Sequence, residues 1–377
     1  MATPGSFPNS LNLNVYRWNT SPTFPEFSNP RYNPKARPIG VCISGGGCRS
    51  FSAAIGQMRG LLALGFQDLI GAVSTVSGGT WFGSIFNYAP GSIDDKTLLG
   101  PVIDPENLTL ENVTTMDKKF IGNPILGLTN SNLATGIAIL KLFSELGLIP
   151  QNRIWSRLLN NCFLINFDLA NTDTFFSLDR SSVDAIVKNN PSFTPSNFYT
   201  LRANRPYFIA GGTQVFPSGQ GSNDIMRRFE YTPLYSGTPQ FFRESGPPPE
   251  FPDFGGGFVQ SFGFDSTTPS PGRNNLAVVP TPNPIFLLSD VMGSSSAAIG
   301  AFLDQFGVTD FFPEFNYWPP VNVGKEPSEL YSFVDGGDLE NTGIVPLLWR
   351  QYPIVYAFVN SSLPIGSSSG FCVDGID

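Results

Sequence analysis

The chain has 377 residues and a formal net charge of −8 at pH 7, and 41% of its residues are apolar. That share includes 34 phenylalanines and 11 tyrosines, which indicates a globular chain with a large core rather than a disordered one. The acidic balance, with no basic cluster denser than the pair Arg227 and Arg228, argues against nucleic acid as a partner. No histidine is present, which excludes Ser-His-Asp and Cys-His catalysis.

The sequence carries no visible targeting or membrane-spanning pattern. The chain opens without a basic segment followed by an apolar core, and no apolar run approaches the length of a membrane span. Its four cysteines include no C-x-x-C pair, which favours reduced thiols in a cytosolic protein. We expect a cytoplasmic protein that meets membranes only peripherally, with no transmembrane segment, no metal and no cofactor.

Residues 1–37 are rich in Pro, Asn and Ser, and they predict an irregular N-terminal arm. Order is expected from residue 38, where the apolar run 38–43 predicts a strand and apolar positions at helical spacing over 53–64 predict a helix. A second strand over 70–76 and a helix starting near 81 repeat this arrangement. Two such units in series imply a parallel sheet.

The middle of the chain loses this rhythm. From about 90 to 200 one helical pattern, 132–148, stands among polar segments, and we interpret the region as an inserted lid. A strand-like run follows at 205–211, and 215–283 looks rich in loops because of its Gly and Pro clusters. The apolar run 284–288 predicts a further strand, with a helix after the serines that follow it.

The last predicted unit is a strand over 330–334, a short helix over 344–349 and a strand over 354–359. The fold class expected from these elements is α/β, a mainly parallel central sheet flanked by helices. We expect one catalytic domain over 38–377, with the lid inserted at about 90–200. Because the chain ends soon after the last strand, it remains open whether it is a fragment of a longer protein.

Ser77 is the strongest candidate nucleophile. It lies at the corner between a predicted strand and a predicted helix, where Gly78 and Gly79 leave room for a strained, exposed serine. Thr75 stands where the G-x-S-x-G pattern has its first glycine, so in isolation Ser77 is better interpreted as a helix cap. Ser295, also between an apolar run and a predicted helix, is the competing nucleophile.

The glycine loop at 45–47 precedes a helix, so two of its glycine amides are candidate donors to an oxyanion. Arg49 lies just inside that helix, where its guanidinium would pair with a phosphate or hold the loop. A nucleotide-binding loop and an ordinary turn are the alternatives. Both nucleotide motifs lack a required residue here, because Ser50 replaces the third glycine and no lysine follows Gly47.

Asp335 follows the predicted strand 330–334 and precedes two glycines that let another segment approach closely. A carboxylate shielded from water at this point would accept the proton of a serine. The same residue would also serve as the first residue of an Asx turn.

Taken together, the segments 44–50, 76–81 and 333–348 resemble, in order and spacing, the catalytic domain of cytosolic phospholipase A2 and lysophospholipase (phospholipase B), in the patatin-like superfamily. The resemblance spans roughly residues 38 to 360. It implies a Ser-Asp dyad of Ser77 and Asp335, oxyanion amides from Gly46 and Gly47, and Arg49 at the phospholipid headgroup or the loop.

The function expected from this resemblance is a serine hydrolase that cleaves fatty-acyl esters of phospholipids or lysophospholipids through an acyl-enzyme. Its partner would be that lipid substrate at a membrane or micelle surface. A catalytically silent lipid-binding protein of the same fold is the alternative, motivated by Thr75, and a nucleotide-binding protein is a weaker one.

Overall fold

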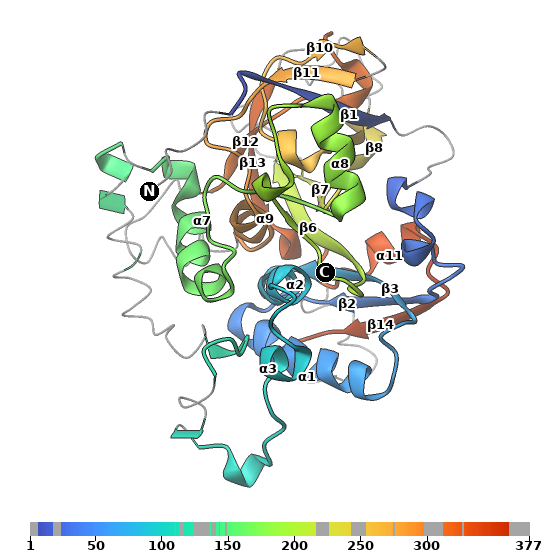
Figure 1. Ribbon diagram of the computed structural model, residues 1–377, viewed down its shortest axis with the longest axis vertical. Helices are drawn as coiled ribbons and strands as arrows, with labels where there is room; N and C mark the ends of the chain where they lie inside the picture. Colours follow the sequence, from blue (N-terminus) through green and yellow to red (C-terminus); the bar gives the residue numbers. More distant parts are fainter. Residues whose placement is uncertain are drawn as a thin grey trace.

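A 12-stranded sheet organises the part of the chain that the computed structural model describes, and helices flank it (Figure 1). The architecture is therefore α/β with one large mixed sheet. No helix among the described residues is long and apolar enough to cross a membrane. The described residues are 7–17, 24–109, 111–112, 117–123, 136, 141–142, 144–147, 149–215, 226–242, 254–273, 276–297, 312–325 and 328–361.

Four strands run parallel at one end of this sheet. They lie side by side as β14 (Ile354–Phe358), β2 (Ile39–Ile43), β3 (Ile70–Val76) and β6 (Tyr207–Val215). Every residue of β2, β3 and β6 is buried, as expected for parallel strands covered on both faces. The predicted strands in these four places are confirmed.

Two helices connect the first parallel strands and confirm the predicted strand–loop–helix units. The helix α1 (Gly47–Ala63) follows β2, and α2 (Gly78–Tyr88) follows β3. Buried residues of α1 recur at helical spacing from Phe51 to Leu61, so one face packs inward while the other meets solvent. The helix α2 is buried on all sides.

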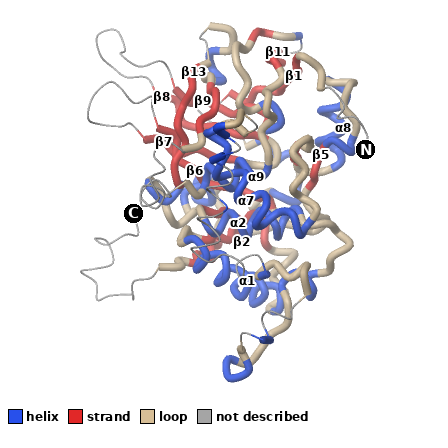
Figure 2. Tube along the Cα trace, turned by 90° about the vertical axis from the view of Figure 1, so that its left-hand side faces the viewer, coloured by secondary structure: helices blue, strands red, loops and turns tan. Residues whose placement is uncertain are grey.

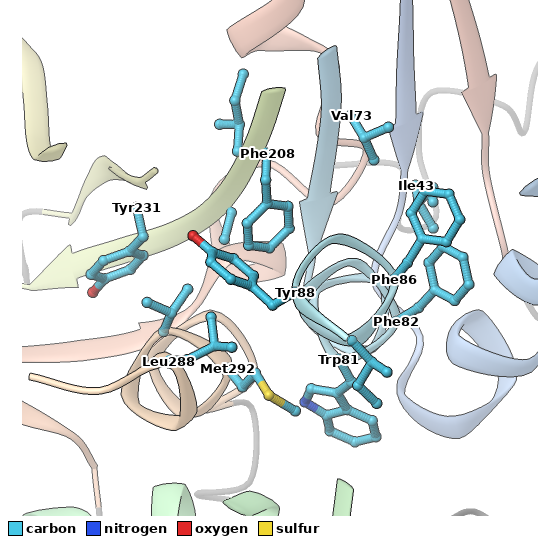
Figure 3. Packing of buried hydrophobic residues seen from close by; sticks show 14 of the residues in the cluster. Ile43, Val73, Trp81, Phe82, Phe86, Tyr88, Phe208, Tyr231, Leu288 and Met292 are labelled. Carbon is cyan, nitrogen blue, oxygen red and sulfur yellow. The ribbon is translucent and has the colours of Figure 1, made fainter. Parts of the chain in front are cut away.

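Aromatic side chains fill the core around α2. Figure 3 shows Phe208 of β6 on one side of α2 and Met292 of the helix α9 (Leu288–Ser295) on the other. Trp81 of α2 lies beside Met292, and Phe82 and Phe86 stack with ring centroids 5.3 Å apart. The helix that follows Ser77 is thus fixed between the sheet and α9.

The rest of the sheet is antiparallel, so the prediction of a mainly parallel sheet is wrong. Past β6 each strand reverses direction relative to its neighbour, through β7 (Met226–Tyr231), β8 (Tyr235–Phe242) and β9 (Phe254–Gln260). The remaining antiparallel strands are β1 (Ser10–Arg17), β10 (Ser270–Pro271), β11 (Leu276–Pro280), β12 (Glu314–Tyr317) and β13 (Glu329–Asp335). Figure 2 shows β7, β8, β9 and β13 gathered away from α1.

The interpretation of residues 215–283 as loop-rich is wrong for much of the described part of this segment, because Gly237 and the glycines 255–257 lie inside β8 and β9. The other two glycine and proline clusters, 216–219 and 246–249, lie outside the described residues. A Cβ atom on Gly237 of β8 would overlap the backbone oxygen of Gly257 in β9. A Cβ atom on Gly257 would overlap the backbone oxygen of Tyr16 in β1. These glycines allow close approach between neighbouring strands rather than marking turns.

The expectation of an irregular arm is wrong over Ser10–Arg17, which form β1 between β11 and β9. Leu11 and Leu13 are fully buried and alternate with polar Asn12 and Asn14, the period of a strand with one face in a core. Asn12 is further held by Asn190, whose side chain accepts from the Asn12 amide at 2.8 Å.

The run 284–288 does not form a strand. Residues 284–287 are irregular, and α9 begins at Leu288 and ends at the serines, where a helix was expected to start. The expected helix 132–148 lies largely outside the described residues, and the proposed lid remains a prediction. In that region and near the C-terminus the other described elements are α3 (Asp95–Leu99), α7 (Ile154–Leu159), β4 (Phe175–Ser177), α8 (Arg180–Asn189), β5 (Phe198–Thr200) and α11 (Val345–Trp349).

Candidate active site

Ser77 forms a strained corner between β3 and α2. Its backbone has φ 51° and ψ −122°, a conformation that costs a non-glycine residue on the order of 1–3 kcal/mol. Its carbonyl accepts from the amides of Thr80 and Trp81, at 2.8 and 3.3 Å. The side chain makes no capping bond to α2, so the helix-cap alternative does not describe its Oγ.

Two glycines make this corner sterically accessible to the neighbouring loop. A Cβ atom on Gly78 would overlap the backbone of Gly47, and one on Gly79 would lie 2.7 Å from the backbone oxygen of Ile43. Such approaches exclude any side chain. The pair Gly78 and Gly79 thus lets the end of β2 and the glycine loop lie directly against Ser77.

Thr75 takes the place of the usual first glycine of the corner, and Gly83 compensates for its bulk. A Cβ atom on Gly83, one helical turn inside α2, would lie 3.0 Å from the Thr75 methyl group. The Thr75 hydroxyl is 2.9 Å from that of Thr80. The threonine therefore fits, and it joins a buried hydrogen-bond network.

Asp335 lies within hydrogen-bond distance of Ser77. Its Oδ2 accepts from the Ser77 Oγ at 2.7 Å, and its Oδ1 accepts from the Gly337 amide at 2.7 Å. Both predicted arrangements occur at once, because one oxygen closes an Asx turn and the other meets the serine. Ser77 is 8% and Asp335 3% exposed, so the pair is shielded from water.

The strand β6 brings these two residues together. Gly211 of β6 pairs with Val76 on one edge and Glu230 of β7 on the other, while Gly212 pairs with Asp335 and with β7. Hence β3 and β13 occupy the same edge of β6. Because β3 is parallel and β13 antiparallel to β6, their carboxyl ends meet at adjacent residues of that edge.

Gly45, the first glycine of the loop, lies against Ser77. A Cβ atom on Gly45 would lie 3.1 Å from the Ser77 Cβ. Gly46 and Gly47 have φ values of 135° and 57°, and Gly47 begins α1, whose first amides have no acceptor within the helix. The role of Gly46 and Gly47 as oxyanion donors stays a prediction.

Asn341 ties the glycine loop to the loop after Asp335. The Gly45 amide donates to both the backbone oxygen and the Oδ1 of Asn341, each at 3.0 Å. Sequence reasoning missed this residue. Its signal was its place in the segment 333–348, six residues after Asp335.

Arg49 is exposed and contacts the end of β14 rather than Ser77. Its Nε donates to the backbone oxygen of Asn360 at 2.8 Å. Asn360 in turn donates from its amide to Ser44 Oγ at 2.7 Å and from Nδ2 to Ser50 Oγ at 3.1 Å. Asn360, which sequence reasoning also missed, thus clamps both ends of the glycine loop.

Ser295 is not arranged as a nucleophile. It is fully buried, and its Oγ donates to the backbone oxygen of Gly211 at 2.6 Å, so its proton is not directed to a base. Instead it contacts the Ser77 backbone, because the Ser77 amide donates to the Ser295 Oγ at 3.0 Å. The competing assignment therefore loses its geometric support.

Two surface cavities lie elsewhere in the molecule. One of about 720 Å³ is lined mainly by aromatic and proline side chains, including Phe24, Phe27 and Pro353. The other, of about 520 Å³, contains Arg157 and Asp173. Neither of these two cavities is lined by Ser77 or Asp335. The described residues contain no cluster of three or more His, Cys, Asp or Glu side chains that would hold a metal ion.

No protein-family model matches this chain, and no curated protein matches it significantly. Among solved structures it is similar to human GIVD cytosolic phospholipase A2, at 14% identity and a TM-score of 0.47 over 87% of this chain and 46% of that one. The same human protein in complex with methyl gamma-linolenyl fluorophosphonate matches at 14% identity and a TM-score of 0.33 over 63% of this chain and 26% of that one. The chain thus spans about half the length of the first of these structures.

Proposed function

We propose that this chain is a serine hydrolase that cleaves fatty-acyl esters of phospholipids or lysophospholipids, with Ser77 as nucleophile and Asp335 as base. The observation that carries the proposal is the 2.7 Å hydrogen bond between Ser77 Oγ and Asp335 Oδ2 at a strained, buried corner. A short bond between a hydroxyl and a carboxylate is what nucleophile activation by a base requires. The proposed substrate class is taken from the resemblance of segments 44–50, 76–81 and 333–348 to cytosolic phospholipase A2 and lysophospholipase.

In the proposed reaction Ser77 Oγ attacks the ester carbonyl carbon and its proton passes to Asp335. The amides of Gly46 and Gly47 stabilise the negative oxygen of the tetrahedral intermediate. As the intermediate collapses, the ester C–O bond breaks and the leaving alcohol takes the proton from Asp335. Water then attacks the acyl-enzyme, gives a proton to Asp335, and releases the fatty acid as Ser77 recovers its hydrogen.

The headgroup is assigned to Arg49 within the same proposal. Its Nε is held by Asn360, so the two terminal nitrogens of the guanidinium would meet the phosphate. We further propose that the protein acts in the cytoplasm at the surface of a membrane or micelle. Replacing Arg49 by Lys would keep the charge but lose the planar fork, and would raise KM more than it lowers kcat.

The decisive experiment compares the wild-type protein with Ser77→Ala and Asp335→Asn on a defined diacyl phospholipid and its lysophospholipid. Each substitution should lower kcat by about 10³-fold or more, since each removes a member of one catalytic unit. A fluorophosphonate probe should label Ser77 covalently in the wild-type protein. The pH profile should show loss of activity in acid and no imidazole step.

A folded Ser77→Ala variant with full activity would remove Ser77 from the assignment. A folded wild-type protein that binds the lipid but neither hydrolyses it nor reacts with the probe would instead be a silent lipid-binding protein. Comparing products from the two lipids identifies the preferred substrate and the ester position that is cleaved.

A further inference from the structure

Three buried hydroxyl groups, those of Ser295, Thr80 and Thr75, form a row of hydrogen bonds, and the Ser77 amide donates to the first of them. The Ser77 amide donates to the Oγ of Ser295 at 3.0 Å and to its backbone oxygen at 3.1 Å. The Oγ of Ser295 lies 2.8 Å from that of Thr80, which lies 2.9 Å from that of Thr75. All three hydroxyl-bearing residues are fully buried.

The number of available protons determines which of the Ser295 and Thr80 hydroxyl groups donates to the other. The Ser295 Oγ has one proton, and it must go to the Gly211 backbone oxygen at 2.6 Å, because a carbonyl only accepts. Ser295 therefore accepts from Thr80, which has no second proton for Thr75. Thr75 has two acceptors within reach, the Thr80 Oγ1 at 2.9 Å and the backbone oxygen of Ile209 at 3.3 Å, and when it donates to the nearer one all three hydroxyl groups are oriented toward Gly211.

Gly211, whose backbone oxygen accepts from Ser295, lies where β3 and β13 meet along β6, next to Ser77 and Asp335. Gly211 pairs with Val76, the residue before Ser77, and Gly212 pairs with Asp335. The Ser295 hydroxyl thus bridges the Ser77 amide and the strand that aligns both catalytic candidates. A strained corner persists only where surrounding contacts hold it, and these are the contacts at its amide.

We infer that Ser295 is a positioning residue that holds Ser77 in its reactive conformation, with Thr80 and Thr75 orienting its hydroxyl. The inference rests on the proposed function for its catalytic consequence. It explains why the residue is serine, since alanine would remove the buried hydroxyl that donates to the Gly211 oxygen and accepts from Thr80. It also gives Thr75 a role that glycine would not fill.

Ser296 provides a matched control. It is adjacent, almost fully buried and equally hydrogen-bonded, since its Oγ accepts from Trp81 Nε1 at 2.9 Å and Trp155 Nε1 at 3.1 Å. Its own proton goes to the Met292 backbone oxygen at 2.7 Å. Ser296→Ala therefore removes a comparable set of buried bonds without touching the Ser77 amide.

The experiment compares Ser295→Ala with Ser296→Ala in the full chain by two measurements. Hydrogen exchange followed by mass spectrometry should show about tenfold faster exchange at the Ser77 amide in Ser295→Ala only. The first-order rate of fluorophosphonate labelling, and kcat on the lipid ester, should fall about 10- to 100-fold in Ser295→Ala with KM little changed. Ser296→Ala should keep both rates, and Thr80→Val should lie between the two.

Equal effects of Ser295→Ala and Ser296→Ala, in proportion to their loss of thermal stability, would overturn the inference by reducing Ser295 to a structural residue. An unchanged Ser77 amide in Ser295→Ala would overturn it as well. If Ser295→Ala does not fold, Thr80→Val carries the same comparison. Should the wild-type protein neither hydrolyse nor label, the proposed function fails, and amide exchange alone decides whether Ser295 holds Ser77.

Discussion

The parallel and antiparallel regions of the sheet contribute to the candidate site in different ways. In the parallel region Ser77 and the glycine loop each follow a buried strand and precede a helix, so a few consecutive residues determine their geometry. In the antiparallel region Asp335 depends on β13 lying along β6, more than a hundred residues away in the sequence. The proposed nucleophile is thus placed by local structure and its proposed base by long-range pairing.

A buried ion cluster joins the two regions. Arg350, between α11 and β14, donates from Nη2 to Glu230 of β7 at 2.9 Å and from Nε to Glu26 at 2.7 Å. The Tyr235 hydroxyl of β8 accepts from the same guanidinium at 2.9 Å. Arg350 and both carboxylates are buried, and Arg228, whose Nη2 lies 3.6 Å from Glu230 Oε1, is the second cation of the cluster.

Replacing Arg350 by Ala should destabilise the contact between the two regions more than any other change, because it leaves Glu26 and Glu230 buried without their shared cation. We expect a loss of about 3–5 kcal/mol in the free energy of unfolding, measured with urea. Arg180→Ala is the matched control, since its ion pair with Asp184 is exposed and is worth at most about 0.5 kcal/mol. Similar losses in both variants would show that the cluster does not hold the regions together.

Gly78→Ala tests the local geometry of the parallel region. The added Cβ would overlap the Gly47 backbone, so the glycine loop has to move away from Ser77. We expect at least a roughly 100-fold loss of ester hydrolysis, as for a misplacement of about 1 Å at a reacting group. Gly60→Ala is the control. Gly60 lies on the exposed side of α1 with open space at its Cβ, so alanine should stabilise the protein by about 0.5–1 kcal/mol.

The same contrast explains what the sequence predicted and what it did not. The strands β2 and β3 and the helices after them were predictable, because apolar runs, glycines and helical spacing are local signals. Ser77 and Asp335 were predictable as candidates from their glycine-rich surroundings. Their contact was implied only by the family resemblance of segments 44–50, 76–81 and 333–348, since it requires β3 and β13 to meet on one edge of β6 and no local pattern encodes that register.

Glycines whose role is long-range do not have a distinct local sequence signal. Gly237 and Gly257 permit strands to approach, yet in the sequence they look like turn residues. In the same way Ser295 has the sequence context of a nucleophile, and only its bond to Gly211 shows that its proton is committed. The alternation of Leu11 and Leu13 with asparagines was a usable signal that the abundance of Pro, Asn and Ser obscured.

The backbone strain at Ser77 predicts a smaller effect, which tests the geometry of the corner between β3 and α2. At φ 51° and ψ −122° glycine has no Cβ to strain, whereas alanine keeps the penalty of serine. Ser77→Gly should therefore be about 1–2 kcal/mol more stable than Ser77→Ala, although neither has a nucleophile. Thermal unfolding of the two variants measures the difference. Equal stability would mean that the corner is relaxed.

The smallest expected effect is a pH-dependent one at Asp95, which anchors α3 to the loop before β6. Its two carboxylate oxygens accept from Arg205, and Arg202 lies 3.3 Å away. Burial alone would raise the pKa of Asp95, but the hydrogen bond and charge of Arg205, with Arg202, outweigh burial and lower it.

Because the folded-state pKa is lowered, ionised Asp95 stabilises the fold above its unfolded pKa of about 3.9, and this contribution is lost as pH falls through the folded value. Asp95→Asn should therefore cost about 1 kcal/mol at pH 7, where the ionised partner of Arg205 is removed. The difference from the wild-type protein should shrink steadily below pH 4. Urea unfolding of both proteins at several pH values measures this, and a difference that stays constant down to pH 2 would mean that Asp95 acts through packing and not through its charge.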